Sequence, residues 1–212
     1  METEIRIDID KRLHKEDQPV IIDIGCGQKK KPGRIGIDQF DLPEIDIVTD
    51  IEKGLSFLPQ RSVDEIHCRS VLEHIHNFDF LLREIMRVLK EDGRAYVFVP
   101  HFSNPYYYSD PTHVRPFGLY TFYYYADFEH QLKRKVPNFY SDLRIQIISQ
   151  KLVFRFEFAL LGFLKKGLGR VINSCQWFQE YYEENLVYHL PAHGIEFVIG
   201  HPPQEKSSAE NA

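Results

Sequence analysis

Hydrophobic residues in the first half of the chain gather in short runs that are bounded by polar residues, glycine or proline. Runs of this length between turn residues are typical of buried strands. The runs cover residues 20–24, 34–38, 45–49, 63–68 and 95–99. Each of them predicts one strand.

Residues 77–90 carry the clearest helical pattern, with apolar side chains recurring at three- and four-residue spacing. The apolar positions are Phe78, Leu81, Leu82, Ile85, Val88 and Leu89. Asn77 or Asp79 can cap the start of this helix, and Gly93 can stop it. Because strands alternate with helical patterns, the sequence predicts an α/β fold with a mostly parallel sheet.

The second half of the chain has a different texture. Residues 101–128 are rich in Tyr, Phe, Pro and His and lack periodicity, which indicates a long acceptor-side loop running into a short helix. Strands are expected within 143–154 and at 195–199, and a helical insertion with a broad apolar face at 156–188. No linker or repeat divides the chain, so we expect one domain over residues 1–200 and a flexible polar tail over 201–212.

Composition narrows the class of protein only slightly. Hydrophobic residues make up 43% and charged residues 27%, and the net charge of -5 argues against a protein that coats nucleic acid. Cys26, Cys68 and Cys175 form no disulfide framework and have no zinc-like spacing. The charged N-terminus lacks a signal-peptide core, and no run reaches the roughly 18 apolar residues that span a bilayer. We therefore expect a cytoplasmic protein.

A glycine-rich turn follows the first predicted strand directly. The segment Asp23-Ile-Gly-Cys-Gly27 lets the backbone turn tightly and approach a ligand at the carboxyl edge of the sheet. The second predicted strand ends at Asp38, and a carboxylate at that place can accept both hydroxyl groups of a ribose. The two features together predict a nucleoside-binding edge.

Two details argue against a dinucleotide at this edge. The third glycine of the G-x-G-x-x-G pattern is replaced by Lys30, and only about ten residues separate Gly27 from Gly36, where a parallel crossover needs a dozen or more. A dinucleotide needs a helix N-terminus for its pyrophosphate. S-adenosylmethionine has no phosphate and tolerates a shortened helix, so the sequence favours the methyl donor. A nucleotide-binding oxidoreductase is the rival reading.

The order of these motifs resembles the class I S-adenosylmethionine-dependent methyltransferases, in particular short ones of the broad type that includes ubiquinone- and sugar-modifying enzymes. The segments that carry the resemblance are IIDIGCGQKKKPGRIGIDQFD, IVTDIEKGLSFLPQRSVDEIHCRSVLEHI and LLREIMRVLKEDGRAYVFVPHF. SDPTHVRPFG resembles a loop of small methyltransferases encoded among polysaccharide-biosynthesis genes. The resemblance implies a Rossmann-like, seven-stranded sheet in the order 3-2-1-4-5-7-6, with a shortened first helix.

The resemblance also implies which residues bind S-adenosylmethionine. They lie after four consecutive strands, where they would surround the methionine part, the ribose, the adenine and the sulfonium. These residues are Asp23, Gly25, Cys26, Gly27, Asp38, Asp50, Ile51, Arg69, Ser70 and Leu72. Glu73 and His74 belong to the LEH segment that follows.

Methyl transfer is an in-line displacement in which the enzyme mainly aligns the acceptor with the donor. An oxygen or nitrogen acceptor also loses a proton, so a nearby base assists. The candidates for the catalytic groups are His74, His101, Asp110 and His113. Asp110 can orient His113 or act as the base itself. Arg115 can hold an anionic group of the acceptor, and Tyr107 and Tyr108 can line its site.

Several alternatives stay open at this point. His101, Asp110 and His113 could gather a divalent metal ion, but their spacing matches no metal motif and we expect none. The basic amphipathic stretch 156–188 could lie on a membrane, although packing on the protein's own sheet or on a second subunit is the more common use. The sequence predicts O-methylation of a small-molecule or glycan-like acceptor. N-methylation of a small molecule is the alternative, as is a protein of this fold without methyl transfer.

Overall fold

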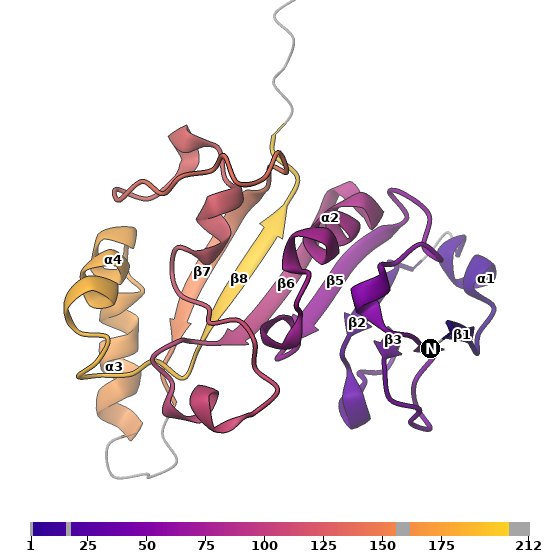
Figure 1. Cartoon of the computed structure of the whole chain (residues 1–212), viewed down its shortest axis with the longest axis horizontal. Helices are drawn as coiled ribbons and strands as arrows, with labels where there is room; N and C mark the ends of the chain where they lie inside the picture. Colours follow the sequence, from indigo (N-terminus) through magenta and orange to yellow (C-terminus); the bar gives the residue numbers. More distant parts are fainter. Residues whose placement is uncertain (1, 16–17, 156–161, 204–212) are drawn as a thin grey trace, which may run out of the picture.

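The computed structural model describes residues 2–15, 18–155 and 162–203, and its centre is one eight-stranded sheet. The strand order is β1-β4-β3-β2-β5-β6-β8-β7 (Figure 1). The strands are β1 Glu4–Ile5, β2 Ile21–Ile24, β3 Ile35–Asp38, β4 Ile47–Val48, β5 Val63–Arg69, β6 Leu89–Pro100, β7 Gln146–Val153 and β8 Gly194–Gly200. The strands from β4 to β6 pair in parallel, whereas β8 runs antiparallel to both β6 and β7.

The seven predicted strands are all present in the predicted order, and the α/β Rossmann-like fold is confirmed. The expected number of strands was too small by one, because β1 adds an antiparallel edge strand beside β4. The sequence could not reveal β1, since it has only two residues and both are exposed. The pairing of Ile5 with Ile47 extends the sheet without forming an apolar run.

The predicted helix is α2, Phe78–Val88, and Asn77 caps it by accepting a hydrogen bond from the Phe80 amide. Its apolar stripe is buried against the sheet. The expected stop at Gly93 was wrong. Leu89 already begins β6, so Gly93 lies inside that strand and the helix passes into it without a loop.

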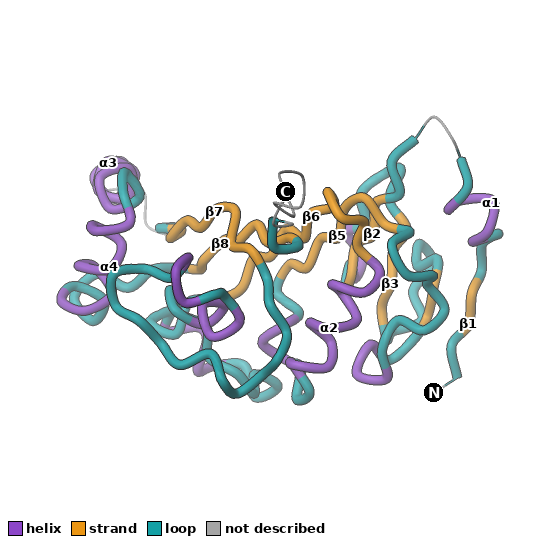
Figure 2. Tube along the Cα trace, turned by 90° about the horizontal axis from the view of Figure 1, so that it is seen from above, coloured by secondary structure: helices purple, strands orange, loops and turns teal. Residues whose placement is uncertain are grey.

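One face of the sheet is covered by α2 and by long loops (Figure 2). Side chains alternate between the two faces, so Ile22 and Ile24 of β2 point into this core, while Asp23 lies on the opposite face. There, His67 of β5 and Tyr96 of β6 lie in register with Asp23, and their rings stack at 4.7 Å between centroids. The crossover after β2 is only a 3-10 turn, Gly27–Lys29, as its length predicted.

The aromatic segment 101–128 is a loop that contains short 3-10 helices, and the short helix expected toward its end is a 3-10 helix, Thr121–Tyr125. Three 3-10 turns follow β6, at Pro105–Ser109, Thr121–Tyr125 and Phe128–His130. Phe117 and Phe122 are fully buried, and their rings pack on Phe78 of α2 at 5.5 and 5.7 Å. Part of the aromatic excess therefore builds the core.

The stretch expected to be helical over 156–188 contains two helices, α3 Gly162–Ile172 and α4 Gln176–Asn185, beside β7 at one end of the sheet (Figure 1). Residues 156–161 lie outside the described part of the chain. Tyr182 of α4 is fully buried, whereas Trp177 and Tyr181 are exposed and stack on each other. Among the described residues no helix is long and apolar enough to cross a membrane. A short helix near the N-terminus, α1, covers Ile9–Leu13.

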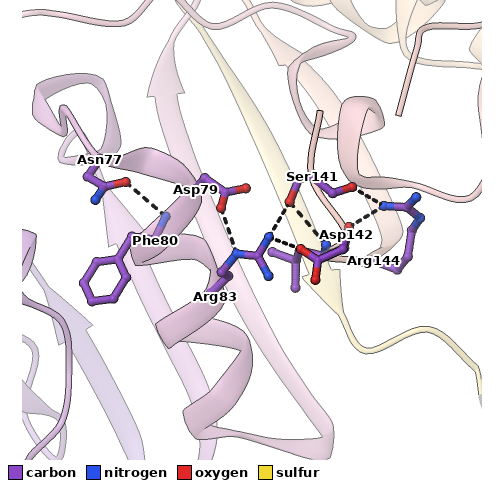
Figure 3. Close-up of polar contacts among 8 residues, drawn as sticks. Asn77, Asp79, Phe80, Arg83, Ser141, Asp142 and Arg144 are labelled. Atoms are coloured by element: carbon purple, nitrogen blue, oxygen red, sulfur yellow. Dashed lines mark hydrogen bonds and ion pairs between the residues drawn. The ribbon is translucent and has the colours of Figure 1, made fainter. Parts of the chain in front are cut away.

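An arginine anchors the segment before β7 to α2. Arg83 binds Asp79 one turn earlier on the same helix, at 2.7 Å, and the Ser141 hydroxyl at 2.8 Å (Figure 3). It also forms an ion pair with Asp142. This clamp holds residues 139–144 beside the N-terminal end of α2, where a cavity described below opens.

Candidate active site

The glycine turn after β2 lies in close contact with the end of β5. Gly25 has a φ of +66° and Gly27 a φ of +52°, conformations that favour glycine. A Cβ atom on Gly25 would lie 2.6 Å from the Cγ2 atom of Val71. Glycine is therefore required at position 25 both by the backbone and by the space that Val71 leaves.

Asp38 lies at the carboxyl end of β3 and is 8% exposed. Its Oδ2 atom accepts a hydrogen bond from the Gly27 amide at 2.8 Å, and its Oδ1 atom accepts one from the Phe40 amide at 3.0 Å. Each carboxylate oxygen has a second lone pair. Asp38 thus fixes the glycine turn and keeps one lone pair on each oxygen for a further hydrogen bond.

Asp50 and Ile51 follow β4 at the same edge of the sheet. The Asp50 side chain accepts a hydrogen bond from the Glu52 amide at 3.1 Å and so caps a 3-10 turn, Ile51–Lys53. The side chains of Ile51 and Leu72 are buried in the core, at 7% and 1% exposure. These two residues support the edge by packing.

A cavity of about 550 Å³ opens beside the glycine turn. Five of the ten residues predicted to bind the donor line it, namely Asp23, Gly25, Cys26, Arg69 and Ser70. Ser70 has a φ of +53°, a strained conformation for a residue other than glycine that is typical of functional sites. The other five predicted donor residues lie along the strand ends but do not line this cavity.

Glu73 follows this edge in a 3-10 turn, Leu72–His74, and its side chain is completely buried. Within the described part of the chain neither carboxylate oxygen accepts a hydrogen bond. Burial raises the pKa of Glu73 to about 7. The Glu73 backbone carbonyl accepts hydrogen bonds from the amides of Val114 and Arg115, which docks the loop after Asp110 onto this turn.

His113 points its Nε2 atom toward two carboxylates. That nitrogen lies 3.7 Å from Oδ2 of Asp110 and 4.0 Å from Oε1 of Glu73. The Nδ1 atom lies 2.8 Å from the Tyr107 carbonyl, which can only accept, so Nδ1 carries the hydrogen. The Tyr107 ring stacks on the imidazole at 4.8 Å. In the neutral imidazole, Nε2 is therefore the basic nitrogen.

His74 completes this cluster. Its ring lies 4.7 Å from that of His113. Thr112 contacts Nδ1 of His74 through its hydroxyl at 2.9 Å, and the same hydroxyl lies 2.6 Å from Asp110. We call the four residues Glu73, His74, Asp110 and His113 the polar cluster. The hydrogen bonds from Thr112 hold the pKa of Asp110 below its usual range.

His101 does not join the polar cluster. Its side chain is fully buried, Nδ1 lies 2.8 Å from the Ser103 hydroxyl, and Nε2 lies 3.0 Å from Oε2 of Glu183 in α4. Both ring nitrogens thus have partners, one within the loop after β6 and one in α4. We therefore do not retain His101 as a base, and the metal site considered with Asp110 and His113 loses one of its members.

A second cavity, of about 480 Å³, opens at the N-terminal end of α2. The four residues of the polar cluster do not line it, but Arg115 does, and the Arg115 amide donates a hydrogen bond to the Glu73 carbonyl. Arg115, Tyr124, Tyr125 and Tyr140 contribute to its wall, together with Asn77 and Asp79 at the start of α2 (Figure 3). The guanidinium of Arg115 lies 5.2 Å from the centre of the Phe78 ring, and its Nε atom is buried without a hydrogen bond among the described residues. Tyr107 is buried, and Tyr108 is exposed.

Comparison with known proteins bears on the fold. A family model described as a methyltransferase domain matches residues 35–97. A comparison with curated proteins finds no match. The chain is similar to the solved structure of the YcgJ protein from Bacillus subtilis, with 16% identity and a TM-score of 0.52 over 92% of this chain and 97% of that one.

Two further structures share the fold. One is the complex between the Haloferax volcanii Trm112 methyltransferase activator and its methyltransferase, with 14% identity and a TM-score of 0.53 over 92% of this chain and 89% of that one. The other is phosphoethanolamine N-methyltransferase 2 from Haemonchus contortus, in complex with phosphomonomethylethanolamine and S-adenosylhomocysteine. It has 14% identity and a TM-score of 0.51, over 92% of this chain and 52% of that one.

The chain therefore has the class I methyltransferase fold that its motifs predicted. The matched methyltransferase domain supports S-adenosylmethionine as its cofactor, and residues 35–97 include the strand ends after β3, β4 and β5. Sequence reasoning placed His113 and Asp110 at the acceptor side. Glu73 was predicted only as part of the LEH segment. Its position, directly after the residues predicted beside the sulfonium, could have marked it as a candidate functional residue.

Proposed function

We propose that this protein transfers the methyl group of S-adenosylmethionine to a hydroxyl oxygen of a small-molecule or glycan-like acceptor. The observation that carries this proposal is the junction after β5. Ser70 lines the donor-side cavity, and Glu73 of the polar cluster follows it three residues later. A donor bound at the strand ends and an acceptor bound at the polar cluster would meet there.

The chemistry asked of this site is modest. A lone pair of the acceptor oxygen attacks the methyl carbon, the carbon–sulfur bond breaks with its electrons going to sulfur, and the hydroxyl proton passes to the pair formed by His113 and Asp110. The products are a methyl ether and S-adenosylhomocysteine. Alignment of the reactants supplies much of the rate. The basic Nε2 atom of His113, oriented by the Tyr107 carbonyl, supports the proton step.

The second cavity supports an acceptor with hydroxyl groups. Tyrosine rings offer flat apolar surfaces beside polar groups, which is the usual make-up of a site for a sugar or a ring-containing molecule. Arg115 at its wall suits a phosphate or carboxylate on the acceptor. The resemblance of the loop at 109–118 to methyltransferases encoded among polysaccharide-biosynthesis genes supports a glycan-like acceptor, and three unpaired cysteines support a reducing, cytoplasmic location.

N-methylation is the second candidate, because one structural neighbour is an N-methyltransferase that binds a small phosphorylated amine. The test is to incubate the protein with methyl-labelled S-adenosylmethionine and two matched panels, one of sugars and sugar phosphates and one of small amines. Label in an ether of a sugar is the expected result. Label only in amines would establish the second candidate. No label in either panel, with S-adenosylhomocysteine bound, would favour a protein of this fold without turnover.

A further inference from the structure

The carboxylate of Glu73 has no partner that explains its burial. It is fully buried, and both of its oxygens lack a hydrogen bond among the described residues. An ionised carboxylate in such a place is unfavourable unless a positive charge compensates for the lost water. The histidine nearest to it, His113, lies 4.0 Å away, beyond hydrogen-bonding distance. The gap between them is too long for direct contact and leaves room for another group.

We propose that Glu73, His74 and His113 bind one divalent transition-metal ion. One ligand atom of each residue lies within 4.8 Å of the others, which encloses a point that all three could reach with small side-chain movements. Two imidazoles and one carboxylate form a ligand set that suits Zn²⁺, Co²⁺ and related ions. No spacing in the sequence predicts this site, because the third ligand, His113, lies in a loop 39 residues after His74.

The groups around the two imidazoles hold them in the form that binds metals. The Tyr107 carbonyl accepts the Nδ1 hydrogen of His113. The Thr112 hydroxyl donates to Asp110 and therefore accepts from Nδ1 of His74. Both rings thus carry their hydrogen on Nδ1 and keep the Nε2 lone pair. Metal-binding histidines usually donate their other nitrogen in this way to a carbonyl, a carboxylate or another acceptor.

Three protein ligands leave at least one coordination position open. An acceptor hydroxyl bound there would have a lowered pKa and would be held beside the donor. Because the ion would occupy Nε2 of His113, the hydroxyl proton would then pass to Asp110, whose Oδ2 atom lies 3.7 Å from that nitrogen. This use of the ion rests on the proposed methyl transfer, whereas the binding of the ion does not. The two ideas can therefore be tested separately.

The test uses the full chain, stripped of metal with a chelator and titrated with Co²⁺, whose visible absorption reports on coordination by nitrogen and oxygen. The variants are Glu73→Gln, His74→Gln and His113→Gln, and the control is His130→Gln, which alters an exposed histidine of another loop. We expect one Co²⁺ per chain in the native protein and in the control. Each ligand variant should bind Co²⁺ at least about tenfold more weakly.

The same samples show whether a variant has failed to fold. Circular dichroism and affinity for S-adenosylhomocysteine should stay near native in all three variants, and Co²⁺ should raise the Tm of the native protein but not of the variants. Absence of stoichiometric Co²⁺ binding by native protein, or equal binding by native and all three folded variants, would overturn the metal site. Co²⁺ binding without methyl transfer to any acceptor would leave the site standing and count against the proposed function.

Discussion

Replacing Glu183 with alanine is expected to lower the free energy of unfolding by about 2–5 kcal/mol, because it leaves two buried groups without partners. Oε2 of Glu183 pairs with His101 at 3.0 Å, and Oε1 accepts a hydrogen bond from the Leu119 amide at 2.8 Å. The Glu183 side chain is 9% exposed and that of His101 is fully buried, so water cannot replace these contacts. Urea denaturation of native and variant protein measures the change.

The neighbouring Glu184 provides the control, since it lies in the same helix and is exposed. Glu184→Ala should change the free energy of unfolding by less than about 0.5 kcal/mol. A loss of similar size in both variants would mean that α4 needs acidic residues in general. It would contradict the view that Glu183 joins α4 to the loop after β6.

Under the proposed function, replacing His113 with alanine is expected to lower kcat for methyl transfer by about 10²- to 10⁴-fold, because the variant loses the nitrogen that we propose assists the proton step. The affinity for S-adenosylhomocysteine should stay within about twofold, since His113 bonds to the Tyr107 carbonyl and points toward Glu73 and Asp110 rather than toward the glycine turn. Single-turnover kinetics and calorimetry measure the two quantities on the same samples.

His130→Ala is the matched control for this experiment, and it should retain native kcat. A His113→Ala variant that keeps kcat within about threefold would remove this residue from the catalytic step. A variant that loses kcat and donor affinity together would indicate that the loop holding His113 shapes the donor site instead.

The strands could be predicted because each buried strand corresponds to a short apolar run in the sequence. Ile35–Asp38 and Val63–Arg69 are examples in which every inward position is hydrophobic and the run ends at a polar residue. Two features of the sheet could not be predicted from such a run. β1 is held by its pairing with β4 and not by its own composition, and Gly93 reads as a helix stop although its neighbours continue the sheet.

The active site could be predicted only as far as its members carry local signals. His113 and Asp110 stand in a proline-stiffened motif, and His74 in a family segment, so the sequence singled them out. His101 is also a histidine, but it is buried against α4. Its partner there, Glu183, is 82 residues away in the sequence, so no local pattern could reveal this burial. The isolation of Glu73 is likewise a tertiary property, since its surroundings depend on where the loop after Asp110 docks.

One face of the sheet beside β2 is open because the segment that follows β2 is too short to form a helix. Only a 3-10 turn fits between Gly27 and Gly36, and a side chain at Gly36 would collide with Cys26 and Lys30. No helix of the described chain covers Asp23, His67 and Tyr96, and part of the donor-side cavity opens there. A donor without phosphate groups is compatible with this missing helix, because no helix N-terminus is required to bind it.

The most direct test of the methyltransferase assignment is the calorimetric affinity of the protein for S-adenosylhomocysteine. We expect the native protein and Asp41→Ala, an exposed acid in the same loop, to bind with micromolar Kd, and Asp38→Ala to bind at least about tenfold more weakly through the loss of ribose hydrogen bonds. No binding by correctly folded native protein, or equal binding by native protein and folded Asp38→Ala, would contradict the donor site described above.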